Sequence, residues 1–64
     1  MANELETKAI DAAFAGVLDK AFTALHFAYT SADGDTAQQT QADERFKTSV
    51  SLARKVRQQA LKQL

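Results

Sequence analysis

A single break interrupts an otherwise helix-forming chain. Segment 31–36 reads Ser-Ala-Asp-Gly-Asp-Thr and is the strongest turn signal in the sequence. The 64 residues include no proline and thirteen alanines, and alanine is the best helix former. Gly34 can adopt the left-handed conformation that ends a helix, and Asp35 or Thr36 can cap the next helix. The sequence therefore predicts an all-α, antiparallel helical hairpin with helices at about 4–32 and 36–63, forming one domain over residues 1–64.

The first predicted helix has a wider apolar face than the second can cover. At 100° per residue, ten of its side chains fall within about 140° of one another. These are Ile10, Phe14, Val17, Leu18, Ala21, Phe22, Leu25, Ala28, Tyr29 and Ala32. The second helix has a narrower seam with spacings of three and four residues, made by Ala42, Phe46, Ser49, Ala53, Val56 and Ala60. Folding about Gly34 should set Phe46 near Phe22 and Val56 near Phe14, and leave much of the first helix uncovered.

A chain of this length buries little surface by itself. Domains of about 60 residues bury only ~60% of their unfolded surface, and they usually need disulfides, a metal or a partner chain. This sequence has no cysteine and one histidine, so self-association is the expected source of further burial. Two hairpins related by a two-fold axis form a four-helix bundle, and two-fold dimers are the commonest oligomers. We expect a homodimer; the alternatives are a lone hairpin and a hairpin covered by a different protein.

The two parts of the chain carry opposite charge. Residues 1–44 have a formal charge of −6 and residues 45–64 a formal charge of +6. In a hairpin the N-terminal acids would come alongside Lys55, Arg57 and Lys62, which is the interpretation we favour. Alternatively, a basic stripe could bind nucleic acid or an acidic partner. Its residues are Lys47, Arg54, Lys55 and Lys62. No aromatic side chain is interleaved with these bases, and the acidic part of the chain would repel phosphate.

Small residues beside one aromatic residue form a candidate surface for a protein partner. Phe27 points away from the main apolar face of the first helix and shares a flank with Ala9, Ala13, Gly16 and Thr23. Small side chains allow another helix to approach closely, and Leu52 of the second helix could join the same surface. The competing interpretation is that this flank is itself the dimer interface.

The turn partly matches a calcium-binding loop. Asp33, Asp35 and Glu44 occupy the first, third and twelfth positions of an EF-hand, where carboxylates bind the ion. However, Ala37 stands where an oxygen ligand belongs, and Gln38 stands where the loop needs glycine. We therefore interpret the segment as a turn followed by a helix cap and expect no metal and no cofactor.

No group of residues in the sequence predicts catalysis. His26 lies at the border of the apolar face, where we expect it to be half-buried, and the serines have no evident histidine partner. Glu4, Glu6 and Asp11 occupy the stretch where a secretory signal would be basic and then apolar, and no run is apolar enough to span a bilayer. We expect a cytoplasmic, non-enzymatic protein–protein interaction module that acts as an adaptor, regulator or inhibitor, with a nucleic-acid-binding regulator as the alternative.

Overall fold

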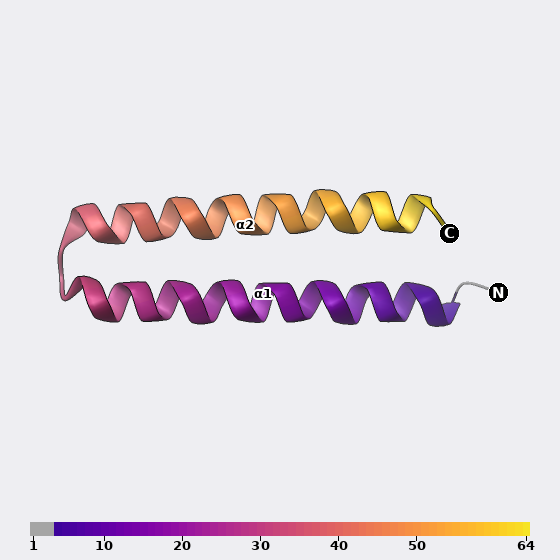
Figure 1. Ribbon diagram of the computed structural model, residues 1–64, viewed down its shortest axis with the longest axis horizontal. Helices are drawn as coiled ribbons and strands as arrows, with labels where there is room; N and C mark the ends of the chain where they lie inside the picture. Colours follow the sequence, from indigo (N-terminus) through magenta and orange to yellow (C-terminus); the bar gives the residue numbers. More distant parts are fainter. Residues whose placement is uncertain (1–3) are drawn as a thin grey trace.

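The computed structural model describes residues 4–64, which form two antiparallel helices joined by a short turn (Figure 1). Helix α1 spans Glu4–Ala32 and helix α2 spans Thr36–Lys62. The two helices lie side by side along their length, and the start of α1 and the end of α2 lie at the same end of the molecule. The predicted all-α hairpin is confirmed, with the end of the second helix one residue earlier than expected. The four-helix bundle stays a prediction.

The turn has the geometry that its residues favour. Asp33 (φ 49°) and Gly34 (φ 85°) both adopt left-handed conformations, which glycine enters freely and aspartate tolerates better than most residues. The backbone N–H of Asp35 donates to the carbonyl oxygen of Ala32 at 3.0 Å. The Asp35 carboxylate accepts a hydrogen bond from the backbone N–H of Gln38 at 3.1 Å and caps α2. Asp35, rather than Thr36, is therefore the capping residue.

The contact between the helices is a single seam rather than a full core. Within residues 4–64 the buried residues are Ala32 (6% exposed) and Ala42 (4%), both close to the turn. The rest of the seam is half-buried and repeats every three or four residues along each helix. In α1 it comprises Ile10, Phe14, Leu18, Ala21, Leu25 and Ala28, and in α2 Phe46, Val50, Ala53, Arg57, Ala60 and Leu61. A seam of this spacing joins two helices and leaves their flanks open.

Helix α2 is rotated relative to the predicted seam. Val50 and Arg57 face α1, whereas Ser49 and Val56 are exposed, so placing those last two in the seam was wrong. The rotation brings the Arg57 guanidinium to 5.5 Å from the centre of the Phe14 ring. Covering an aromatic face with a cation stabilises this arrangement by about 0.5–1 kcal/mol. Prediction from apolar residues alone could not include that contact.

The hairpin exposes more surface than a folded monomer of its mass normally does. Its accessible surface is 5138 Å², compared with about 4,000 Å² expected for a monomer of 7.0 kDa. It is a rod of 50 × 15 × 8 Å with a radius of gyration of 15.1 Å, whereas a compact domain of this length has a radius of about 11 Å. Val17, Phe22 and Tyr29 of the wide α1 face all remain exposed. The prediction that α2 leaves much of α1 uncovered is confirmed.

Candidate functional site

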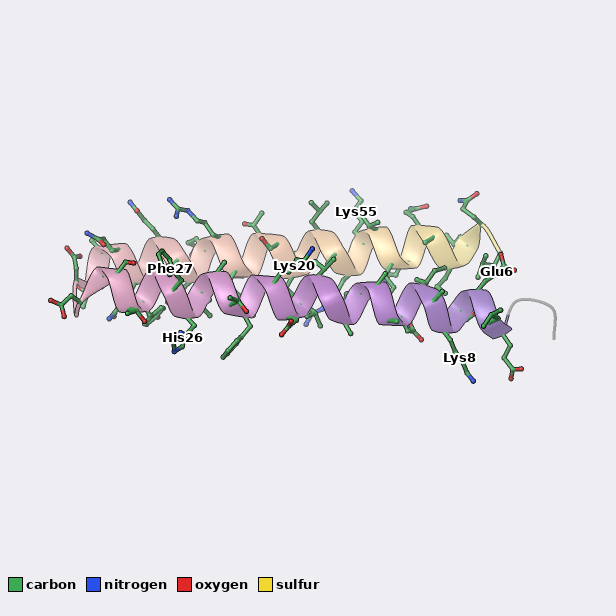
Figure 2. The ribbon with its side chains drawn as sticks, turned by 60° about the horizontal axis from the view of Figure 1, so that its bottom comes forward. Glu6, Lys8, Lys20, His26, Phe27 and Lys55 are labelled. Carbon is green, nitrogen blue, oxygen red and sulfur yellow. The ribbon has the colours of Figure 1, made fainter. Side chains whose placement is uncertain are left out.

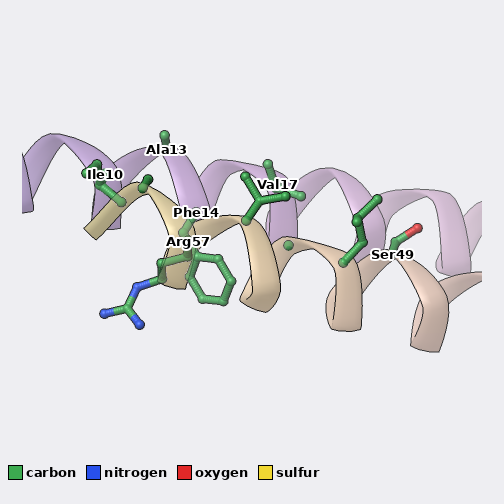
Figure 3. Close-up of a pocket in the computed structure, with 10 residues that line it drawn as sticks. Ile10, Ala13, Phe14, Val17, Ser49 and Arg57 are labelled. Carbon is green, nitrogen blue, oxygen red and sulfur yellow. The ribbon is translucent and has the colours of Figure 1, made fainter. Parts of the chain in front are cut away.

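An apolar groove runs between the two helices on one face of the hairpin. It has a volume of about 470 Å³, and both helices line it (Figure 3). Ala13 and Val17 form the wall on α1, and Leu52 and Val56 form the wall on α2. The floor comes from seam residues such as Phe14. Leu52 and Val56 are 60% and 57% exposed, so a good part of each side chain is available to a further molecule.

A smaller hollow of about 100 Å³ extends the groove toward the turn. Ser49 lines both cavities, so the two are adjacent along the same face. The smaller hollow is lined mainly by alanines, with Leu25, Phe46 and Arg45 completing it; the alanines are Ala21, Ala24, Ala28 and Ala42. Neither cavity has a carboxylate in its lining. We call the residues that line the two cavities the groove face.

Polar contacts join the helices through Asp11, Tyr29 and Asp43, which lie on the flank opposite the groove; Arg57, which also lines the larger cavity, reaches this flank with its guanidinium. Asp11 accepts a hydrogen bond from Arg57 Nε at 2.8 Å, which is also an ion pair. The Tyr29 hydroxyl donates a hydrogen bond to Asp43 Oδ1 at 2.7 Å. This hydrogen bond, with smaller effects from desolvation and from the carboxylate charge, raises the pKa of Tyr29 above its ordinary value of 10.0.

Helix geometry explains why the two sides differ. Asp11 and Tyr29 are eighteen residues apart, which is about five turns, so both lie along one line of α1. Val17 lies about 120° from that line at 100° per residue. The seam falls between them, so one flank of the hairpin carries the polar pairs and the other carries the groove. The groove face is therefore an apolar surface that the fold leaves unpartnered, while Phe22 and Phe27 are also exposed but lie outside it.

The structure separates the residues predicted to bind a protein partner. Ala13 and Leu52 come together on opposite walls of the groove. The other four, Phe27, Ala9, Gly16 and Thr23, are exposed and lie on the outer side of α1, away from α2; Figure 2 shows this side, with Phe27 and Lys20 on it. Phe27 is 71% exposed. We call these four residues the Phe27 flank.

Two details describe the Phe27 flank further. A Cβ atom added at Gly16 would meet no atom within 4 Å, so packing within one chain does not require glycine there. The Thr23 hydroxyl donates to the carbonyl oxygen of Asp19 at 3.0 Å, which ties this side chain to its own helix.

Sequence reasoning missed Val56 as a groove wall because it assigned this residue to the seam. It also placed Val17 on the broad apolar face without predicting that this residue would border a groove.

The basic residues of α2 pair with acids less than expected. Of the three bases predicted to lie alongside N-terminal acids, Arg57 forms an ion pair, and it is the one ion pair found within residues 4–64. Pairing of Lys55 and Lys62 with those acids is not observed, because both lie on the side of α2 turned away from α1. The four residues of the basic stripe, Lys47, Arg54, Lys55 and Lys62, are all exposed.

His26 and the acidic residues at the turn contact groups within the hairpin or lie inside a helix. His26 is exposed rather than half-buried, because the seam passes on the other side of Phe22; its ring stacks on that of Phe22 with centroids 6.4 Å apart. Asp35 caps α2, and Glu44 lies inside that helix. In the described part of the chain, no group of three or more His, Cys, Asp or Glu residues could hold a metal ion.

The chain matches no protein-family profile, no curated protein and no solved structure. Over residues 4–64, neither helix contains a stretch apolar enough to cross a bilayer. The fold defines the molecule as an all-α, two-helix hairpin.

Proposed function

We propose that this protein is a small non-enzymatic interaction module that acts as a homodimer of helical hairpins and binds other proteins as an adaptor, regulator or inhibitor. The observation that carries the proposal is the excess surface of the single chain. The 5138 Å² of accessible surface exceeds the expectation for a monomer by about 1,100 Å². A stable protein–protein interface removes about 800 Å² from each partner. One interface of ordinary size would therefore bring the hairpin close to a normal folded surface.

The groove face is the part of the surface where this burial stabilises most. Leu52 and Val56 each keep more than half of their surface in water. At about 25 cal/mol per Å² of apolar surface, covering the exposed part of one such side chain contributes roughly 2 kcal/mol. The flank with Asp11 and Tyr29 also exposes Phe22, but a second chain placed there would have to cover charged and hydroxyl groups that already have partners, so its burial stabilises less.

The test measures association directly. Sedimentation equilibrium should give the mass of a dimer at micromolar concentration, and the melting temperature should rise with protein concentration by mass action. Leu52→Asp should give a monomer, because it would bury an unpaired carboxylate in the interface. The matched control is Thr48→Asp, at an exposed position of α2 outside both cavities. A monomer mass together with a melt that does not depend on concentration would contradict the proposal.

A partner protein would bind the Phe27 flank, which stays on the outside when the groove face is occupied. Phe27 offers an exposed aromatic anchor, and Ala9 and Gly16 allow a partner helix to approach closely. Phe27→Asp should leave the helical content and the dimer mass unchanged and abolish recovery of a specific partner from the native host. If this variant recovers the same proteins as the unmodified chain, the Phe27 flank is not the binding surface.

The alternative function is nucleic-acid binding, which the exposure of the basic stripe favours. Lys47, Arg54, Lys55 and Lys62 all face solvent, and in a dimer the stripe would occur twice. Binding through phosphates should weaken steeply as salt rises. A gel-shift titration with RNA and duplex DNA at several salt concentrations tests this alternative. The absence of a shift at low salt would exclude it.

A further inference from the structure

We infer that a second copy of the chain occupies the groove face with its turn at the opposite end of the bundle. This inference rests on the proposed homodimer and adds its orientation. Two hairpins packed face to face can place their turns at the same end or at opposite ends. In both arrangements every helix has antiparallel neighbours, so helix direction does not distinguish them. The two arrangements differ in how side-chain size and charge match along the rod.

Side-chain size changes along the groove face. Away from the turn, three of the four wall residues are large, namely Val17, Leu52 and Val56, and the fourth is Ala13. Toward the turn, half of the lining residues are alanines, with Leu25, Arg45 and Phe46 as the larger side chains, and the cavity falls from about 470 to about 100 Å³. Turns at the same end would place large walls on large walls and alanines on alanines, which would force the helices apart at one end. Turns at opposite ends place large walls over alanines and keep the spacing even, as close packing requires.

Charge also changes along the rod. The half of the rod nearer the turn, residues 19–49, contains five acids and three bases, one of which is Arg45 of the groove face. The other end, formed by residues 4–18 and 51–64, contains five bases and three acids. Turns at the same end would bring like charges together, and turns at opposite ends would set the acidic end of one copy against the basic end of the other. Salt screens such charges over about 8 Å at physiological ionic strength, so they select orientation more than they add affinity.

These two arguments also favour a second copy over an unrelated partner. The gradients in size and in charge run in the same direction along one chain, so an identical chain reversed end to end complements both. The groove face also extends over most of the hairpin, because the two cavities together involve residues from Ile10 to Ala28 in α1 and from Ala42 to Ala60 in α2. A reversed copy presents a face of the same length.

The experiment measures distances between labels on the two copies. The chain has no cysteine, so Ala37→Cys and Gln59→Cys each introduce a single site for a nitroxide label. Both positions are exposed and line neither cavity. Ala37 lies beside the turn and Gln59 near the other end, about 33 Å away along α2. Pulsed electron paramagnetic resonance would measure each variant alone and a mixture of the two.

Opposite turns predict label separations above about 30 Å for each variant alone, and an Ala37–Gln59 separation in the mixture that is shorter by at least about 10 Å. The reverse pattern would overturn the orientation while leaving the homodimer intact. A monomer, which gives no dipolar signal between copies, would overturn both the orientation and the proposed homodimer. Leu52→Asp should raise the dissociation constant of the dimer at least about 100-fold, since it buries an unpaired carboxylate. If Phe27→Asp has this effect and Leu52→Asp does not, the groove face is not where the second copy binds.

Discussion

Substitution by alanine should change the stability of the fold in opposite directions at the two glycines of the chain. Gly16 lies in the middle of α1, where an added Cβ atom would meet nothing within 4 Å, and Gly34 lies in the turn with φ +85°. In a helix interior, alanine is more favourable than glycine by about 0.8–1 kcal/mol. In the left-handed region, a Cβ atom costs roughly 1–2 kcal/mol. Gly16→Ala should therefore stabilise the fold, and Gly34→Ala should destabilise it.

The size of the effect follows from the length of the chain. For a domain of 60–100 residues, 1 kcal/mol shifts the melting temperature by about 4–8 °C. In a dimer both the energy change and the entropy of unfolding double, so the shift stays the same. Gly16→Ala should raise the melting temperature by about 4–8 °C, and Gly34→Ala should lower it by at least as much. Circular dichroism at 222 nm, recorded at matched protein concentrations, measures both.

One result would refute the reasoning for Gly16. Within a single chain nothing approaches this position, so a lower melting temperature for Gly16→Ala requires a second chain packed against the outer side of α1. That outcome would move the dimer interface from the groove face to the Phe27 flank. Ala12→Gly, a reverse substitution at another exposed α1 position, should lower the melting temperature by the same few degrees and serves as the control for helix propensity.

Three further predictions concern polar contacts. Asp43→Asn should lower the pKa of Tyr29 toward 10.0, because the carboxylate that holds the phenol protonated is removed; this is the one tyrosine of the chain, so phenolate absorbance at 295 nm reports it directly. Since the folded-state pKa of Tyr29 is raised, the stability from this contact is fully present below pH 10 and is lost as pH rises through the folded value, and an equally steep alkaline loss of stability in Asp43→Asn would contradict the assignment. Asp35→Ala should cost about 1 kcal/mol in urea unfolding, and Asp35→Asn much less, since asparagine also caps helices; equal losses would show that the cap contributes nothing. Asp11→Asn should cost at most about 1 kcal/mol, and the loss should shrink in high salt, because its ion pair with Arg57 is partly exposed; a cost independent of salt would indicate a packing role instead.

Local signals in the sequence were sufficient to predict the hairpin. Gly34 and Asp35 fix where one helix ends and the next begins, and the alanine-rich segments on both sides have no competing structure. The exposed apolar face of α1 also follows from counting, because α2 has too few large apolar residues to cover it. These features depend on residues close together in the chain.

The rotation of α2 and the division of the candidate site could not be predicted in the same way. They depend on contacts between residues far apart in the sequence, such as Arg57 with Asp11 and with Phe14. Because the Arg57 guanidinium contacts Asp11 and Phe14, Arg57 lies in the seam and Val56 lies on the groove wall. Helical projection treats each helix alone, so it grouped Ala13 with Phe27 and could not predict that Ala13 borders a groove against α2 whereas Phe27 points away from α2.

The position of the two buried alanines determines where the hairpin opens first. Ala32 and Ala42 lie next to the turn, whereas the seam residues from there to the free ends of the helices are only half-buried. Separation of the helices should therefore begin at the free ends and proceed toward the turn like a zipper, with amide protons near Ala42 exchanging with solvent last. Fraying at the free ends of the helices exposes the backbone to cleavage. A chain that covers these ends should therefore slow proteolysis of the whole molecule.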